Sequence, residues 1–193
     1  MPHRTPAAIG LALAALAMPT AAAAPGATAA AWTVAKAASS LRFEGVAQDE
    51  AFSGSFGKWD ATIHFDPANL GASQAIVTID TASGGTGDPD KDGPLKDENW
   101  LATAMFPTAT FKSDTISSTG PGAYVAEGTL TIRGVSQPVS LPFTLAIDGD
   151  NAKMQGSVTL DRNLFKIGAG AWQDHSVDPS VTVKVDLVAK RAG

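Results

Sequence analysis

The stretch "YVAEGTLTIRGVSQPVSLPFTLAI", residues 124–147, carries apolar or small side chains at every second position on either side of a central break. The first run extends from Tyr124 to Ile132 and the second from Val139 to Ile147. Alternation with a period of two is typical of strands with one buried and one solvated face, as in antiparallel sheets. The stretch therefore predicts two strands, and it leaves open whether their apolar faces meet a packed core or a molecule that is not protein.

The same alternation recurs along most of the chain and indicates an all-β fold. The other alternating runs are residues 41–43, 59–65, 75–79, 152–160 and 181–187. Turn-forming segments such as "DPANLG", "STGPGA" and "DGDNA" separate these runs. About eight antiparallel strands at such short spacing predict a sandwich or an up-and-down barrel.

One segment, residues 88–107, lacks the strand period. Gly93 and Pro94 are suited to begin a helix, because proline is tolerated in the first turn. Phe106 precedes a proline and is disfavoured in helical angles. We therefore expect a helical insertion near residues 94–106, with the helix itself over 95–105 and Trp100, Leu101 and Met105 on its apolar side.

The first residues are typical of an export signal. A short basic start, the apolar run of residues 7–17 and the small residues of "MPTAAAA" predict cleavage after Ala23. Residues 1–23 are then a signal peptide, residues 24–31 are expected to be disordered, and residues 32–190 form one domain. A retained membrane anchor is the competing interpretation, but no stop-transfer stretch follows. We expect the protein in a bacterial periplasm.

Composition excludes several classes of partner and site. The formal net charge is −5, which argues against nucleic acid as a partner. The sequence contains no polybasic cluster of the kind that attracts anionic lipid head groups. The chain contains no cysteine, so disulfides and thiolate chemistry are excluded.

The acidic segment "DPDKDG", residues 88–93, has the spacing of the start of a calcium loop. The twelfth position of such a loop should be a bidentate Glu, and here it is Asn99. An acidic surface turn before a helix is the interpretation we favour. We therefore expect no metal site in this segment.

The segment "DHS" contains Asp174, His175 and Ser176, the residue types of a catalytic triad. Triads form by convergence in space, and neighbours on an extended segment alternate sides. After loss of the signal peptide only His64 and His175 remain, too few and too far apart in sequence for a zinc site. We expect neither an enzyme nor a cofactor.

The stretch "RNLFKIGAGAW", residues 162–172, allows two interpretations. It is either a strand that ends in a loop, or a rim where Arg162, Lys166 and Trp172 meet the head group of an amphiphile. The sequence favours the first interpretation, and we keep the three residues as candidate rim contacts.

The predicted interior mixes small and large side chains, which suits an elongated apolar slot. An eight-stranded barrel can be filled by side chains or can hold one small ligand. The small inward positions are Ala61, Ala75, Ala126, Gly128, Ala152 and Gly156. The candidate lining residues are Phe43, Trp59, Ile63, Phe65, Val77, Trp100, Met105, Gly128, Leu130, Phe143, Met154 and Val158.

Several stretches, taken in order, resemble the YceI-like proteins over about residues 32–189. They are "FSGSFGKWDATIHFDP" (52–67), "DENWLATAMFPTATFKS" (97–113), "YVAEGTLTIRGVSQPVSLPF" (124–143) and "RNLFKIG" (162–168). The resemblance implies an exported, lipocalin-like antiparallel barrel with a helical insertion. It also implies that the interior carries a polyisoprenoid chain or an isoprenoid quinone, for sequestration or transport.

The resemblance further implies transient contact with a membrane or a membrane cytochrome, and it provides no catalytic residues. The glycine-rich segment after "TIDTASG" and residues 171–180 depart from the family pattern, which affects the expected rim. The rival hypothesis is a packed barrel without ligand that binds a periplasmic partner or acts in a stress response.

Overall fold

The computed structural model describes residues 28–168 and 176–192, and most of their regular structure is β-strand. The strands are β1 (Ala31–Val34), β2 (Ser40–Ala47), β3 (Glu50–Phe56), β4 (Trp59–His64), β5 (Gln74–Asp80), β6 (Gly84–Gly85), β7 (Thr108–Gly120), β8 (Ala123–Ile132), β9 (Val135–Asp148), β10 (Asn151–Asp161) and β11 (Ser180–Arg191). The helical elements in these residues are α1 (Pro89–Lys96) and the 3-10 turns η1 (Lys36–Ala38), η2 (Leu70–Ala72), η3 (Thr81–Ser83) and η4 (Arg162–Phe165).

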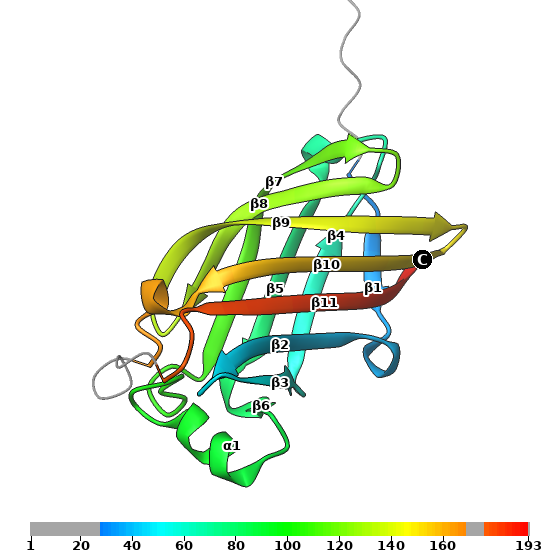
Figure 1. Cartoon of the computed structure of the whole chain (residues 1–193). Helices are drawn as coiled ribbons and strands as arrows, with labels where there is room; N and C mark the ends of the chain where they lie inside the picture. The colour runs from blue at the N-terminus through cyan, green and yellow to red at the C-terminus, as the bar shows by residue number, and fades with distance from the viewer. Residues whose placement is uncertain (1–27, 169–175, 193) are drawn as a thin grey trace, which may run out of the picture.

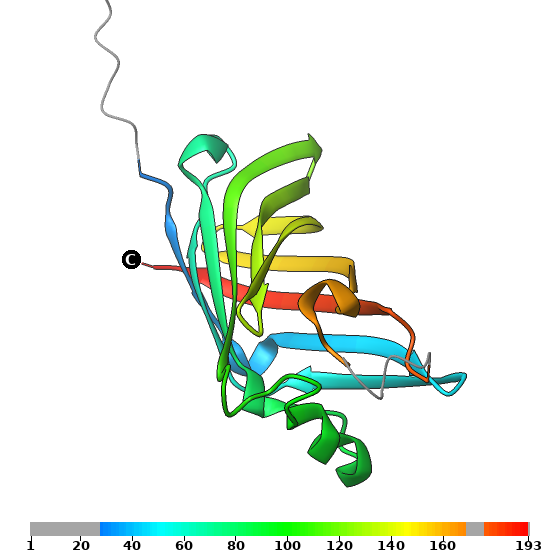
Figure 2. The ribbon, with the colours of Figure 1, turned by 90° about the vertical axis from the view of Figure 1, so that its left-hand side faces the viewer.

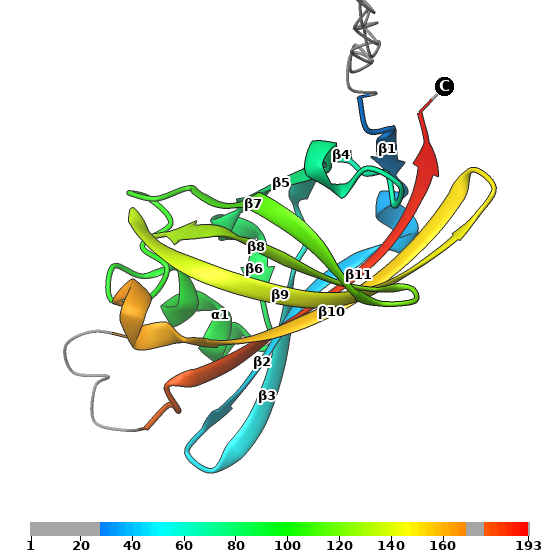
Figure 3. The same cartoon turned by 90° about the horizontal axis from the view of Figure 1, so that it is seen from above.

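Eight of the strands form a closed antiparallel ring, which confirms the predicted barrel (Figures 1 and 2). Around the ring the order is β1-β4-β5-β7-β8-β9-β10-β11, and pairing of β1 with β11 closes it. The strands β2, β3 and β6 extend the sheet beyond the ring, because β2 continues along the edge of β11 after β1 ends. Figure 3 shows this extension beside α1.

The stretch of residues 124–147 forms the β8–β9 hairpin, with Ile132 paired to Val135. Two residues, Arg133 and Gly134, make the turn with φ values of 52° and 70°. Positive φ at both turn residues is the geometry that matches the twist of the flanking strands. The apolar residues of both runs thereby face the barrel interior on one side of the hairpin.

The helical insertion begins and ends earlier than the sequence pattern predicts. Asp88 caps α1 by accepting a hydrogen bond from the backbone N–H of Asp90 at 3.0 Å, so the helix begins at Pro89. It ends at Lys96, and residues 97–106 form turns in which Ala102 has a φ of 48°. The predicted helix over 95–105 is therefore wrong, because the aspartate cap fixes the start six residues upstream.

The predicted signal peptide, residues 1–23, and residues 24–27 lie outside the described residues. Residues 28–31, for which we expected disorder, instead contact the sheet. Ala29 is buried, and the carbonyl of Ala30 accepts a hydrogen bond from Phe65 N at 2.8 Å. Among residues 28–168 and 176–192, no helix has the length and apolar character needed to cross a bilayer.

Two apolar clusters lie toward opposite ends of the barrel. The first has Trp32, Phe65 and Ile116 at its centre, together with small residues of β8, β10 and β11. The second consists of Leu130, Val139 and Phe165 with half-buried neighbours. The middle of the barrel, between the clusters, is where the candidate site lies.

Candidate functional site

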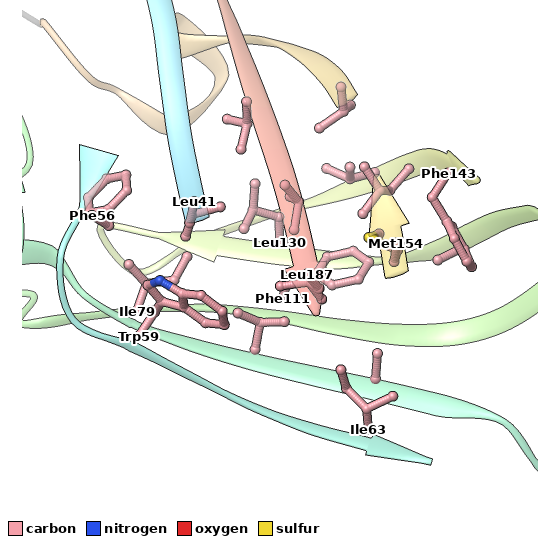
Figure 4. A pocket seen from close by; sticks show the side chains of 18 of the residues that line it. Leu41, Phe56, Trp59, Ile63, Ile79, Phe111, Leu130, Phe143, Met154 and Leu187 are labelled. Atoms are coloured by element: carbon pink, nitrogen blue, oxygen red, sulfur yellow. The ribbon is translucent and has the colours of Figure 1, made fainter. Parts of the chain in front are cut away.

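The barrel interior contains a cavity of about 210 Å³ (Figure 4). Its wall is built from side chains of every strand of the ring, together with Leu41, Phe56, Phe65, Thr81 and Leu101. Of the described residues that line it, none is charged. Alternation along each strand explains this composition, because it directs the apolar phase inward and the polar phase to solvent.

The inward side chains of several strands remain half-buried although strands surround them. Leu141, Phe143, Leu145 and Ile147 of β9 show this pattern, and each alternates with an exposed outward neighbour. Side chains in a close-packed interior have protein atoms on all sides. These residues instead face the cavity, so the apolar phase of the β8–β9 stretch meets space that protein does not fill.

Two polar groups of the cavity wall, those of Trp32 and Thr81, are already hydrogen-bonded within the protein. Trp32 Nε1 donates to the carbonyl of Phe65 at 3.0 Å. Thr81 Oγ1 donates to the carbonyl of Phe106 at 2.8 Å. These bonds satisfy donors that would otherwise disfavour an apolar occupant. The site therefore suits a hydrocarbon chain far better than a polar molecule.

Eight of the twelve candidate lining residues lie on the cavity wall. They are Trp59, Ile63, Phe65, Val77, Leu130, Phe143, Met154 and Val158. Figure 4 shows Trp59, Ile63, Leu130, Phe143 and Met154 among the side chains around the cavity. Placement on the wall follows from the inward phase of each strand, and a role in ligand binding stays a prediction.

Gly128 does not open space for a ligand. A Cβ built at this position would lie 2.3 Å from the carbonyl oxygen of Lys112, so the neighbouring backbone of β7 occupies the room. The register of β7 and β8 also shifts between Ser113 and Thr115, next to the pair Ser113–Gly128. Glycine is needed here for close approach of two strands at an irregularity. The prediction that Gly128 makes room for a ligand in the slot is therefore wrong.

Phe43, Trp100 and Met105 also lie off the cavity wall. Phe43 packs in the β2–β3 extension, with its ring centroid 5.3 Å from that of Phe56. Trp100 lies beneath the guanidinium of Arg162, whose Cζ is 5.7 Å from the ring centroid. Met105 is 64% exposed. The last two were placed inward because a helix was expected, and the segment forms turns instead.

Arg162 is a buried structural residue, so its predicted role at a charged rim is wrong. Its side chain is 4% exposed. The guanidinium donates to the carbonyl oxygens of Val177, Ile167 and Asp178 at 2.6, 2.7 and 3.0 Å. A guanidinium with its donors bound to backbone carbonyls has little capacity left for a head group.

The other two rim candidates have different positions. Lys166 is exposed and adopts a left-handed backbone conformation after η4, with φ 59°. Trp172 lies outside the described residues, as do Asp174 and His175. The rim therefore stays a prediction for Lys166 and Trp172.

Arg133 was missed by sequence reasoning and joins three segments at one end of the barrel. Its guanidinium donates to the carbonyl of Glu98 at 2.7 Å and also to the carbonyls of Asn99 and Lys166. Burial lowers the pKa of Arg133, and the nearby charge of Glu98 acts in the opposite direction. An arginine before a turn glycine carries no distinctive signal, so only the structure reveals this role.

The wall also includes residues that the sequence analysis did not single out. They include Phe111 and Ile116 of β7, and Val183, Val185 and Leu187 of β11. The alternation over residues 181–187 was recognised as a strand, and its apolar phase contained the signal. In β7 only Ala109 and Phe111 follow the apolar alternation before the pairing becomes irregular near Ser113, so the sequence does not show which of its residues point inward.

The acidic segment at the start of α1 is used for local structure. The Asp92 carboxylate accepts hydrogen bonds from the Thr86 backbone N–H at 2.5 Å, the Thr86 hydroxyl at 2.8 Å and the Gly87 N–H at 3.2 Å. Asp88 caps the helix and pairs with Lys91 at 2.6 Å. These contacts favour the acidic-turn interpretation over a calcium loop. In the part of the chain that the structure describes, no three potential ligands cluster around a metal position.

Comparison with known proteins gives matches over most of the domain. A family model described as a YceI-like domain matches residues 32–189. A UPF0312 protein from Pseudomonas syringae pv. tomato is 31% identical over 135 residues, covering 67% of this chain and 70% of that protein. One from Yersinia pestis is 37% identical over 98 residues, covering 51% and 50%. The chain thus spans between half and about two thirds of the length of these curated relatives.

Two solved structures have similar folds. BcnA from Burkholderia cenocepacia is 33% identical, with a TM-score of 0.79 over 82% of this chain and 100% of that chain. A polyisoprenoid binding domain from Saccharophagus degradans, implicated in plant cell wall breakdown, has a TM-score of 0.67 at 16% identity, over 84% and 99% of the two chains. The second comparison concerns the fold alone.

Proposed function

The chain belongs to the YceI-like family, and on that premise we propose that it is a lipid-binding protein that holds a polyisoprenoid chain or an isoprenoid quinone inside its barrel. The observation that carries the proposal is the cavity of about 210 Å³, whose wall, as far as the structure describes the chain, contains no charged residue. The name of the Saccharophagus degradans domain, which describes polyisoprenoid binding, supports the same ligand class.

The physical basis of binding is burial of hydrocarbon. Each methylene group that leaves water contributes roughly 0.8 kcal/mol, part of which is offset by ordering of the chain. The wall residues Val77, Leu141 and Val185 offer contacts of this kind without charge or fixed geometry. Such a wall selects for length and apolar character, which polyprenyl lipids and the tails of isoprenoid quinones share.

The head group is proposed to lie outside the cavity wall. A phosphate or a hydrated hydroxyl would lose its water in the barrel and find no charged partner there, which is unfavourable. The volume of about 210 Å³ is also smaller than the roughly 300–1,000 Å³ of typical small-molecule pockets. A long isoprenoid therefore needs either side-chain movement or a route by which part of it leaves the barrel.

The rival hypothesis of a packed, ligand-free barrel is disfavoured by the half-buried inward side chains of β9. We further propose that the protein acts without catalysis, by sequestration or transport. Export to the periplasm is proposed on the pattern of residues 1–23 alone. Transient contact with a membrane or a membrane cytochrome is proposed as the source or destination of the ligand.

Filling the cavity tests the proposal. Val77 lines the cavity, and Thr78 next to it on β5 is exposed. Val77→Phe adds an aromatic ring inside, whereas the matched control Thr78→Phe adds the same ring outside. Both variants are purified gently, checked for β-sheet content by circular dichroism, and analysed by native mass spectrometry and organic extraction.

We expect wild type and Thr78→Phe to carry isoprenoid lipid, and Val77→Phe to bind it at least about tenfold more weakly, which corresponds to roughly 1.4 kcal/mol. Equal lipid content in the two variants would show that binding does not occur in the barrel. Absence of isoprenoid from the wild type, even after incubation with farnesol or a short-chain ubiquinone, would overturn the proposed function itself.

A further inference from the structure

The β9–β10 ladder ends before either strand does. The last pair is Gly156–Phe143, although β9 extends back to Val135 and β10 continues to Asp161. Each strand keeps its other partner over the rest of its length, since β9 stays paired with β8 and β10 with β11. The ring therefore contains a split between residues 135–142 and 157–161. Figure 1 shows β9 curving away from β10 on the side where η4 lies.

Two prolines explain the split. In the β8–β9 hairpin the pair next to the two-residue turn, Ile132–Val135, exchanges both hydrogen bonds. Odd-numbered residues of β9 therefore point their backbone groups toward β8, and even-numbered residues point toward β10. Pro138 and Pro142 are both even and have no N–H to donate. Pro142 would be the next residue to pair after Phe143, so the ladder stops there.

Apolar side chains border the split on both sides. Val139 and Leu141 of β9, and Val158 and Leu160 of β10, all line the cavity. The split is thus continuous with the proposed ligand site. A hydrocarbon chain passing between these strands would contact branched aliphatic side chains along its path.

Phe165 of η4 fills the cavity side of the split. It is 2% exposed and forms a cluster with Leu130 and Val139, against which Val158 and Leu160 also pack. Its neighbour Leu164 is 55% exposed. The amide of Gln137, on an inward position of β9, donates to the carbonyl of Leu164 at 3.2 Å and ties η4 to the strand. Arg162 anchors the other end of η4 through its carbonyl contacts.

A second interruption of the barrel wall is closed by charge. The start of β4 has no strand paired to it on the side of β1, because the β1–β4 pairing ends at Trp32 and Ile63. At this place the Lys36 ammonium donates to the Trp59 carbonyl and forms an ion pair with Asp60 at 2.9 Å. An isoprenoid chain crossing at that point would have to displace an ion pair. The β9–β10 split offers an apolar path without an ion pair among the described residues, and the side chain of Gln137 ties η4 to β9 there.

We propose that the β9–β10 split is the port through which the isoprenoid chain enters and leaves the barrel, with Phe165 as the plug and the Gln137–Leu164 hydrogen bond as the latch. The inference rests on the proposed function and adds the route of exchange. Displacement of Phe165 connects the cavity with the split while a chain passes, and behind a chain as short as farnesol the plug and the latch close again, so their loss affects entry and exit alike. The exposed Leu164 side chain lies beside the emerging chain.

Exchange kinetics test the port. Gln137→Ala removes the latch and leaves Phe165 in place. The matched control is Gln155→Ala, which removes a glutamine hydrogen bond to Asp186 of 2.9 Å on the outer face of β10. Association and dissociation rates of dansyl-labelled farnesol are measured by stopped-flow fluorescence for wild type and both variants.

We expect Gln137→Ala to raise both rates by about 3–10-fold, as loss of one hydrogen bond from the closed state predicts, with the equilibrium constant changed by less than about twofold. Gln155→Ala should exchange like the wild type. A variant at a site that only contacts ligand would change the dissociation constant instead. Equal rates for Gln137→Ala and Gln155→Ala would overturn the port.

Two further variants keep the test decisive. Phe165→Leu shortens the plug with a smaller loss of core volume than alanine would cause, and should raise both rates. Pro142→Thr restores an N–H that faces β10, extends the ladder and should slow both rates. Unchanged rates in both variants would also overturn the port, whereas failure of the probe to bind the wild type would overturn the proposed function together with it.

Discussion

At the scale of single residues, Arg162 links two stretches of backbone, around residue 167 and at residues 177–178, to the ring of Trp100. Its guanidinium binds carbonyls of Ile167, Val177 and Asp178 and lies over the ring of Trp100. Among the described residues no carboxylate pairs with this buried charge, and the carbonyl dipoles and the indole face stabilise it. Replacement of this side chain would leave several buried acceptors without donors.

We therefore expect Arg162→Met to lower the free energy of unfolding by roughly 3 kcal/mol or more, because each buried unsatisfied group costs about 1–3 kcal/mol. The matched control is Lys166→Met, an exposed cation four residues away, which should change stability by less than about 0.5 kcal/mol. Urea unfolding followed by tryptophan fluorescence measures both. A similar small effect for the two variants would contradict the structural role of Arg162 and return it to the candidate rim.

The residue scale also shows where sequence reasoning about the site succeeds. Val77, Leu130 and Met154 line the cavity because strict alternation fixes which side of a strand each residue occupies. Gly128 and Arg162 were misjudged because their roles depend on partners distant in sequence, a carbonyl of β7 and the carbonyls near residue 177. Neither partner leaves a local signal in the sequence.

At the scale of elements, strands were predictable where the apolar phase is long and unbroken, as in β8, β9 and β10. β3 was not, because its inward positions alternate Phe52, Gly54 and Phe56 with serine, which has the composition of a turn. Gly54 is small because the ring of Phe43 occupies its space, where an added Cβ would lie 2.2 Å from Phe43 Cζ. The helix was misplaced because Pro94 was taken for its first turn, whereas Asp88 caps it, Pro89 begins it and Pro94 lies inside it.

The attachment of α1 to β6 provides a prediction at this scale. Hydrogen bonds from the Thr86 N–H and hydroxyl lower the pKa of Asp92 below its ordinary value. Burial opposes them, and the Gly87 N–H and the charge of Lys96 make smaller contributions that also lower the pKa. Because the folded pKa is depressed, the stabilisation is present above the ordinary aspartate pKa of about 3.9 and is lost as pH falls through the folded value.

We therefore expect the Thr86 amide to be protected from hydrogen exchange near neutral pH and to lose protection relative to the barrel strands below about pH 4. Asp92→Asn should show reduced protection at neutral pH and no further loss on acidification. The measurement is hydrogen exchange by mass spectrometry over the 84–97 segment, with β10 as the internal reference. A wild-type segment whose relative protection does not change with pH would contradict this contact.

At the scale of the whole molecule, the barrel follows from the sequence but the cavity does not. Alternation and turn spacing imply about eight antiparallel strands, in a sandwich or a barrel, and the resemblance to the YceI-like proteins implies the barrel. The free volume depends on the way in which large side chains such as Phe111 and Phe143 pack against each other across the barrel. That packing joins strands distant in sequence and cannot be predicted from a local pattern. Ala126 and Ala152, which suggested a slot, do line the cavity, whereas the space beside Gly128 is taken by the backbone of β7. The expectation of a slot thus rested partly on a residue that does not form it.

An unfilled apolar cavity predicts a thermodynamic link between ligand and stability. A ligand that binds only the folded barrel stabilises it by mass action, by about 2.7 kcal/mol when its free concentration is a hundred times the dissociation constant. For a chain of this size each kcal/mol corresponds to roughly 2–4 °C in Tm, so saturation with a short-chain ubiquinone should raise Tm by about 5–10 °C. The ligand-free form is prepared by organic extraction and refolding, and Tm is followed by circular dichroism.

Val77→Phe distinguishes stabilisation by a ligand inside the cavity from stabilisation by a ligand bound at the surface. Its ring fills part of the void, so we expect its Tm without ligand to equal or exceed that of ligand-free wild type, and its response to ubiquinone to be small. Thr78→Phe should respond like the wild type, since its ring lies outside. If ubiquinone raised the Tm of Val77→Phe as much as that of Thr78→Phe, the ligand would be stabilising the protein from its surface. The interior of the barrel would then have to be explained without an isoprenoid occupant.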